Sequence, residues 1–120
     1  MKNGFETYQE NTITTQNQGR LVVMLYEGAI KFLKLAIPEM KAGNHEAKSK
    51  YLTKAEDIIN ELSTVLDMDA GGEIAKNLRA LYVFMIKHLH EANAKQDSGK
   101  IEEVIKLLEE LNQSWRAISS

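Results

Sequence analysis

The sequence predicts an all-α protein, an antiparallel up-down four-helix bundle with an N-terminal extended arm. The chain has 120 residues, which is the size of a single domain. Its apolar residues recur at intervals of three and four, the period of an amphipathic helix, and it contains one proline. Short connections between the periodic segments imply that neighbouring helices run antiparallel. We therefore expect an arm over residues 1–17 and a bundle domain over residues 18–120.

The first predicted helix covers residues 18–40 and the second covers residues 45–66. Pro38 lacks the amide that would bond to the carbonyl of the residue four positions earlier, so we expect the last turn of the first helix to be kinked or separate. The tripeptide Ala42-Gly43-Asn44 is expected to close the first helix and to cap the second.

The third predicted helix covers residues 73–95 and follows a loop that contains two glycines and two acids. The fourth covers residues 100–118 and follows Asp97-Ser98-Gly99, which breaks one helix and caps the next. The stripes expected to face the core are Ile74, Leu78, Leu81, Tyr82, Met85, Leu89 and Ala92 in the third helix, and Ile101, Val104, Ile105, Leu108, Leu111, Trp115 and Ile118 in the fourth.

Residues 1–17 are too polar to form a core of their own. Their larger apolar side chains are Phe5, Tyr8 and Ile13, through which we expect the arm to dock on the bundle. A frayed terminus without a role is the alternative that the sequence leaves open.

Two of the predicted helices carry more apolar residues than one core face can use. The runs LVVMLY at residues 21–26 and ALYVFMI at residues 80–86 are long enough to wrap around a helix. A glycine inside a helix costs about 1 kcal/mol relative to alanine, which predicts that something packs close to the backbone at Gly28. These surfaces are covered either by the chain itself or by a partner protein. The residues left outside the core stripes are Leu21, Met24, Gly28 and Leu35 in the first helix, and Val83, Phe84 and Ile86 in the third.

Composition and charge exclude several classes of function. The net charge of −2 argues against nucleic-acid binding, and we interpret the lysines of residues 31–54 as a solvated face. The absence of cysteine excludes disulfides and thiolate metal sites. No apolar run approaches the ~20 residues that span a bilayer, and the first twenty residues lack the apolar region of a secretory signal. We expect a cytoplasmic protein that binds neither membrane nor nucleic acid.

We predict no catalytic, cofactor-binding or metal-binding residues. No glutamate stands three positions before a histidine, as bundles with a pair of metal ions require. His88 and His90 lie two positions apart and so point in different directions on a helix, and His45 is distant in the sequence. Neither His88 nor His90 is followed by the lysine and glycine of a phosphotransfer bundle.

The order and spacing of several short blocks resemble a known family. The blocks are Phe5-x-x-Tyr8-Gln9; the Leu-x-x-Met-Leu-Tyr-x-Gly pattern at residues 21–28; Lys54-Ala55 with Ile58-Ile59 and Glu61-Leu62; Gly71-Gly72-Glu73-Ile74-Ala75 leading to Asn77-Leu78 and Leu81-Tyr82; and Leu89 with Ala92-Asn93, ending near Trp115. Together they resemble the FliS family, the flagellin-specific secretion chaperones of flagellar export, over nearly the whole chain. Phe5 stands where the family usually has a tyrosine, and Gln16-Asn17-Gln18-Gly19-Arg20 replaces its small-residue and proline turn.

The resemblance implies a cytoplasmic chaperone that needs no cofactor. Such a protein would bind the disordered C-terminal segment of flagellin, block premature filament assembly and deliver the subunit to the export gate. We expect the free protein to be a monomer or a weak homodimer. The expected partner-binding residues are Tyr8, Ile13, Leu21, Met24, Tyr26, Gly28, Leu35, Tyr82, Val83 and Ile86.

Two alternatives stay open. Tyr26 and Tyr82 also lie on core stripes, so they serve either the core or the partner. The chain as a whole could instead be a self-associating helical adaptor or regulatory protein without catalytic activity, in which a second copy covers the surplus apolar faces.

Overall fold

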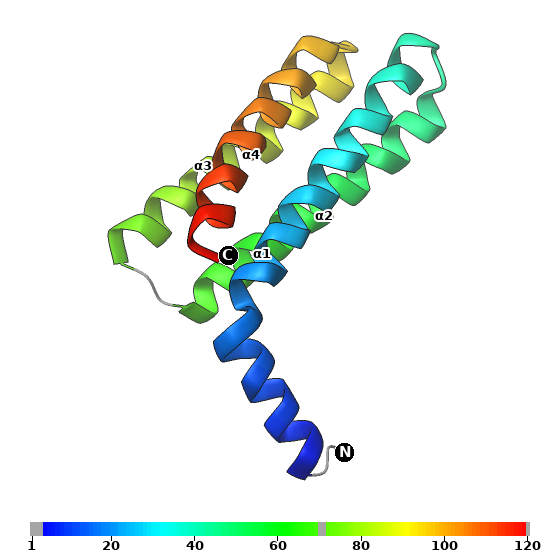
Figure 1. Cartoon of the computed structure of the whole chain (residues 1–120). Coiled ribbons are helices and arrows are strands. Elements are labelled where there is room, and N and C mark those ends of the chain that lie inside the picture. The colour runs from blue at the N-terminus through cyan, green and yellow to red at the C-terminus, as the bar shows by residue number, and fades with distance from the viewer. Residues whose placement is uncertain (1–3, 70–71, 120) are drawn as a thin grey trace.

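The computed structural model describes the backbone of residues 4–69 and 72–119, and the side chains of residues 19–66 and 72–118. The described chain forms four helices and no strand (Figure 1): α1 (Gly4–Lys41), α2 (His45–Asp69), α3 (Gly72–Lys95) and α4 (Ser98–Ser119). The prediction of an all-α fold with four helices is confirmed. The last three helices begin and end within three residues of their expected bounds.

The start of α1 differs from the expectation. Because α1 begins at Gly4, the backbone of residues 4–17 is helical and not an extended arm. Neither proline nor glycine occurs between Gly4 and Gly19, so nothing in this segment interrupts the helical hydrogen bonds, whatever its polarity. The side chains of Phe5, Tyr8 and Ile13 lie outside the described residues. At its other end α1 continues through Pro38 to Lys41, so the last turn is not separate.

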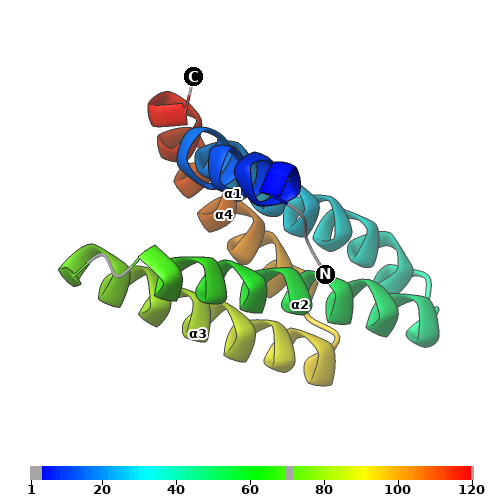
Figure 2. The ribbon, with the colours of Figure 1, turned by 90° about the horizontal axis from the view of Figure 1, so that it is seen from below.

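The helices occupy the four corners of a bundle, with successive helices running in opposite directions (Figure 1). α1 packs against α2 and α4, and α3 packs against the same two helices. Figure 2 shows α2 alongside α3 when the bundle is seen from below. α1 and α3 therefore lie at opposite corners, and their outer faces point in different directions.

All four helices contribute apolar side chains to one core, as the periodicity predicts. Ile74 and Ile118 are the exceptions, because both were expected to face the core and both are exposed. They lie in the first turn of α3 and the last turn of α4, where a helix has fewer neighbours. The largest side chains with almost no exposed surface are Tyr26, Leu33, Leu52, Ile59, Met85, Leu89, Ile101, Val104 and Leu108.

The connection between α1 and α2 is the predicted glycine cap. The amide of Asn44 donates to the carbonyl of Glu39 (2.9 Å) and the amide of Gly43 donates to that of Met40 (3.2 Å), which is a Schellman motif. Gly43 has a φ of 77°, the left-handed conformation that this motif requires. The carbonyl of Asn44 then accepts the first hydrogen bond of α2, from the amide of Lys48 (2.9 Å).

The connection between α3 and α4 has the same form without a glycine. The amide of Asp97 donates to the carbonyl of Ala92 (3.0 Å), and Gln96 holds the left-handed conformation with a φ of 54°. The carboxylate of Asp97 caps α4 by accepting a hydrogen bond from the amide of Lys100 (3.3 Å). Gln96 thus has a strained backbone at the position where Gly43 has none.

The two caps predict opposite effects of substitution. Gln96→Gly should raise the free energy of unfolding by about 0.5–1 kcal/mol, because the left-handed conformation costs a side chain about 1–2 kcal/mol and glycine loses only part of this in flexibility. Gly43→Ala should lower it by about 1 kcal/mol for the same reason. Urea denaturation followed by far-ultraviolet dichroism measures both values. A Gln96→Gly protein less stable than the wild type would contradict this interpretation.

Candidate protein-binding surface

An apolar line runs along the outer face of α1. Met24 is 67% exposed, Leu21 is 43% exposed and Leu35 is 37% exposed. At about 100° per residue these three side chains point to the same side of the helix, away from its core stripe. Exposed apolar side chains that share one face are typical of a surface that binds another molecule. The structure thus brings together three of the predicted partner-binding residues.

Gly28 belongs to the same side of α1, but its role is internal. A Cβ atom at this position would lie 3.2 Å from Cδ1 of Ile58 on α2, closer than an ordinary van der Waals contact. The close approach that the sequence predicted at Gly28 is therefore made by the neighbouring helix. A large side chain here would push α2 away, so Gly28→Leu does not separate loss of binding from loss of packing.

Tyr26 and Tyr82 are buried in the core and do not contribute to the surface. Their hydroxyl oxygens lie 2.5 Å apart, so that one donates a hydrogen bond to the other across the diagonal from α1 to α3. Burial raises the pKa of both tyrosines above the ordinary value of 10.0. Of the two roles left open for these residues, the structure shows the one in the core.

The outer face of α3 carries a second, separate apolar surface. Val83 is 60% exposed, whereas Ile86 is half-buried and packs against the core. Phe84, which was identified as surplus but not placed in the predicted site, is exposed about 100° around α3 from Val83, where its ring stacks on His88 with 4.9 Å between ring centroids. Because α1 and α3 lie at opposite corners, the predicted site divides into two surfaces. The remaining predicted residues, Tyr8 and Ile13, lie outside the described side chains.

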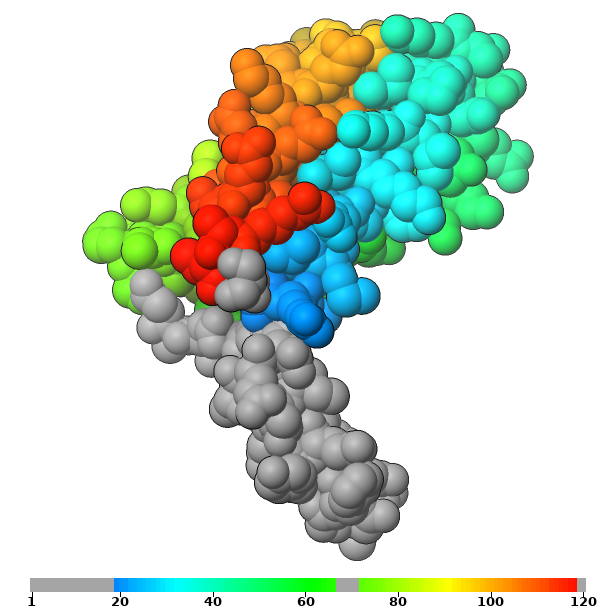
Figure 3. Space-filling view, in the orientation of Figure 1, coloured from blue at the N-terminus to red at the C-terminus, as the bar shows by residue number. Residues whose placement is uncertain are grey.

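A groove of about 720 Å³ lies between α1 and α4, next to the apolar line. Figure 3 shows the face of the molecule on which the two helices lie side by side. Ion pairs cross the groove at two levels, Glu27 with Arg116 and Lys34 with Glu109 (3.2 Å). Leu35 lines the groove as well, which makes the groove continuous with the apolar line on α1.

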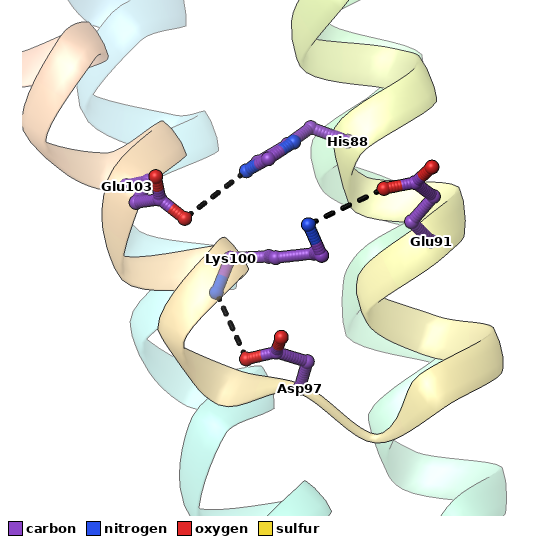
Figure 4. A network of polar contacts seen from close by, with 5 residues as sticks. All are labelled: His88, Glu91, Asp97, Lys100 and Glu103. Carbon is purple, nitrogen blue, oxygen red and sulfur yellow. Dashed lines mark hydrogen bonds and ion pairs between the residues drawn. The ribbon is translucent and has the colours of Figure 1, made fainter.

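Two of the three histidines, His88 and His90, take part in polar contacts between helices. Nε2 of His88 lies 3.2 Å from Oε1 of Glu103 on α4, and Nε2 of His90 lies 2.7 Å from Oε1 of Glu56 on α2. Figure 4 shows His88 directed toward Glu103 beside an ion pair between Lys100 and Glu91 (3.3 Å). The ammonium group of Lys100 lowers the pKa of Glu91. Over the described residues, no three potential ligands gather to hold a metal ion.

Among the residues that the structure describes, no helix is both long enough and apolar enough to cross a bilayer.

A model of the family described as "Flagellar protein FliS" matches residues 1–120. The chain belongs to the FliS family. It is 40% identical to the flagellar secretion chaperone FliS of Salmonella typhimurium over 92% of this chain and 82% of that protein. It is 35% identical to the flagellar secretion chaperone FliS of Vibrio cholerae, over 98% of this chain and 90% of that protein. It is 33% identical to that of Bacillus subtilis, over 97% of this chain and 86% of that protein. The resemblance read from the sequence blocks is confirmed.

FliS relatives are named as flagellar secretion chaperones, and the predicted class of a non-enzymatic chaperone agrees with these names. In this member of the FliS family, the features that can serve such a role are the two apolar surfaces and the groove beside α1.

The tyrosine pair of this FliS-family protein predicts strong coupling between two substitutions. Tyr26→Phe and Tyr82→Phe should each destabilise the protein by about 1–3 kcal/mol, because each leaves a buried hydroxyl unpaired. The unfolding free energy that the double variant loses should be smaller than the sum of the two single losses, by about 0.5 kcal/mol or more. Urea unfolding of the four proteins measures the coupling. Additive losses would show that the hydroxyls do not depend on each other.

The same pair predicts a dependence of stability on pH. The folded protein holds the two phenolic protons more tightly than the unfolded chain, because the pKa of both tyrosines is raised on folding. The contribution of the pair is thus fully present below about pH 10 and is lost as the pH rises above it. Unfolding free energies measured between about pH 9 and 11 should fall less steeply in the double phenylalanine variant than in the wild type. Equal slopes would contradict the prediction.

Proposed function

We propose that this protein is a cytoplasmic export chaperone that binds the disordered C-terminal segment of flagellin. Bound in this way, flagellin could not polymerise before it is exported, and the complex would deliver it to the flagellar export apparatus. The observation that carries the proposal is the exposed apolar line of Leu21, Met24 and Leu35 on α1, in a chain that belongs to the FliS family.

The energetics favour a long client segment over a short one. Ordering the backbone of a disordered chain costs about 1–2 kcal/mol per residue. Full burial of a leucine, valine or methionine side chain contributes about 1.5–3 kcal/mol, and only the exposed part of each side chain is still available for this gain. A client that covers the line on α1 and continues to Val83 on α3 would gather enough apolar contact to offset its ordering. Its helical turns would add backbone hydrogen bonds.

Met24 provides the sharpest test, because it is the most exposed residue of the apolar line. We expect wild-type protein to bind the C-terminal segment of the flagellin encoded in the same genome, with a negative heat-capacity change and a gain of helix in far-ultraviolet dichroism. Met24→Glu should raise the Kd at least tenfold, which is about 1.4 kcal/mol, because it places a charge against the apolar client. Isothermal titration calorimetry measures both.

The matched control is Thr53→Glu, which adds the same charge at an exposed position of α2. This variant should bind as tightly as the wild type. Equal affinity of the Met24→Glu protein would remove α1 from the client contact. Val83→Glu, which adds the charge to α3, tests whether one client reaches both surfaces.

Self-association is the alternative that the two apolar surfaces also allow, because a second copy would cover them in the absence of a client. It predicts a molecular mass that rises with concentration in light scattering, together with no heat on addition of the flagellin segment. A constant mass with saturable binding of the segment is the result expected of the export chaperone.

A further inference from the structure

The groove between α1 and α4 contains a buried polar group without a partner. Asn112 is 5% exposed and lines the groove, and its Oδ1 accepts no hydrogen bond from any described residue. Buried amide oxygens are almost always hydrogen-bonded in folded proteins, so an unpaired one calls for an explanation. Asn112 lies four positions after Leu108, a core residue, and this polar position on the core face of α4 was overlooked in the sequence.

The two ion pairs frame the position of Asn112. Glu27 and Lys34 are seven residues apart on α1, as are Glu109 and Arg116 on α4, so the two pairs are about two helical turns or 10 Å apart. Asn112 lies between them on α4. The ion pairs thus enclose a compartment of the groove, and the amide of Asn112 belongs to its wall.

The opposite wall of the compartment comes from α1, where Ile30 and Lys31 lie between Glu27 and Lys34 and also line the groove. Oδ1 of Asn112 is shielded from solvent, and because the χ2 torsion of asparagine is soft, rotation of the amide would turn this oxygen to the groove without moving the helix.

The charges around this compartment favour an uncharged occupant. Both carboxylates, Glu27 and Glu109, already face a cation across the groove. A positively charged donor would therefore lose its hydration without gaining a free counter-charge. An uncharged amide or hydroxyl group satisfies the oxygen of Asn112 at a smaller cost of desolvation.

We propose that this compartment receives an uncharged hydrogen-bond donor, an amide or hydroxyl side chain of the client segment, which pairs with Asn112. The inference rests on the proposed function, since Leu35 makes the groove continuous with the surface assigned to the client. Asn112 is then a specificity-determining residue that the free protein holds unpaired and the bound client satisfies. A client segment with only apolar side chains at this point leaves the oxygen unpaired and binds less tightly.

The test replaces the amide by an apolar side chain of similar size in the full-length protein. Asn112→Leu should keep or increase the stability toward urea, because it removes an unpaired buried polar group. The same substitution should raise the Kd for the flagellin C-terminal segment by roughly tenfold, because one hydrogen bond with the client is lost. Asn112→Ala provides a second variant in case leucine does not fit. The matched control is Asn60→Leu, the same change at an exposed position of α2, which should not affect binding.

The outcomes separate the two proposals. If the wild type binds the segment and both Asn112 variants bind it equally well, Asn112 has a structural role only and the inference is overturned, while the export chaperone stands. If the wild type does not bind the segment, the proposed function fails and the inference fails with it. Weaker binding by Asn112→Leu at undiminished stability supports the inference.

Discussion

The arrangement of the bundle depends on the hydrogen bond between Tyr26 and Tyr82. A hydroxyl group buried without a partner costs about 1–3 kcal/mol, so α1 and α3 are most stable in the register that brings the two side chains together. Met24 lies two positions before Tyr26, about 200° around the helix, and must point outward when Tyr26 points inward. The exposed apolar line on α1 is therefore a consequence of the core contact.

Most of the fold can be predicted from the helical period of the sequence. Three of the helices follow from it to within three residues, because an amphipathic stripe and its caps are local features. The N-terminal part of α1 was misjudged because polarity was taken as evidence against a helix. Polarity shows only that residues 4–17 lack a core of their own, whereas their backbone has nothing that breaks a helix. The exposure of Ile74 and Ile118 was missed because a stripe does not show where the neighbouring helices end.

The candidate site was predictable in composition but not in layout. The apolar runs predicted exposed residues on α1 and α3, and Met24 and Val83 are among the most exposed apolar side chains described. That these residues face different directions depends on which helices are neighbours, and the spacing within one helix does not encode this. Gly28 illustrates the same limit, because the need for a close contact was visible in the sequence and the helix that supplies it was not. Asn112 could not be identified from the sequence, because its role depends on the burial of its amide, which only the structure shows.

The two seams along α1 differ in the contacts that close them at the surface. The seam with α2 is closed at Gly28 by the side chain of Ile58, and separating that contact would expose apolar surface. The seam with α4 is bridged by ion pairs between exposed side chains, such as Lys34 with Glu109, and such pairs contribute only about 0–1 kcal/mol each. A segment that passes from the outer face of α1 to that of α3 must cross α2 or α4. For the client proposed above, the surface of the α4 seam offers weak ion pairs and an unpaired amide, whereas the α2 seam offers a closed apolar contact.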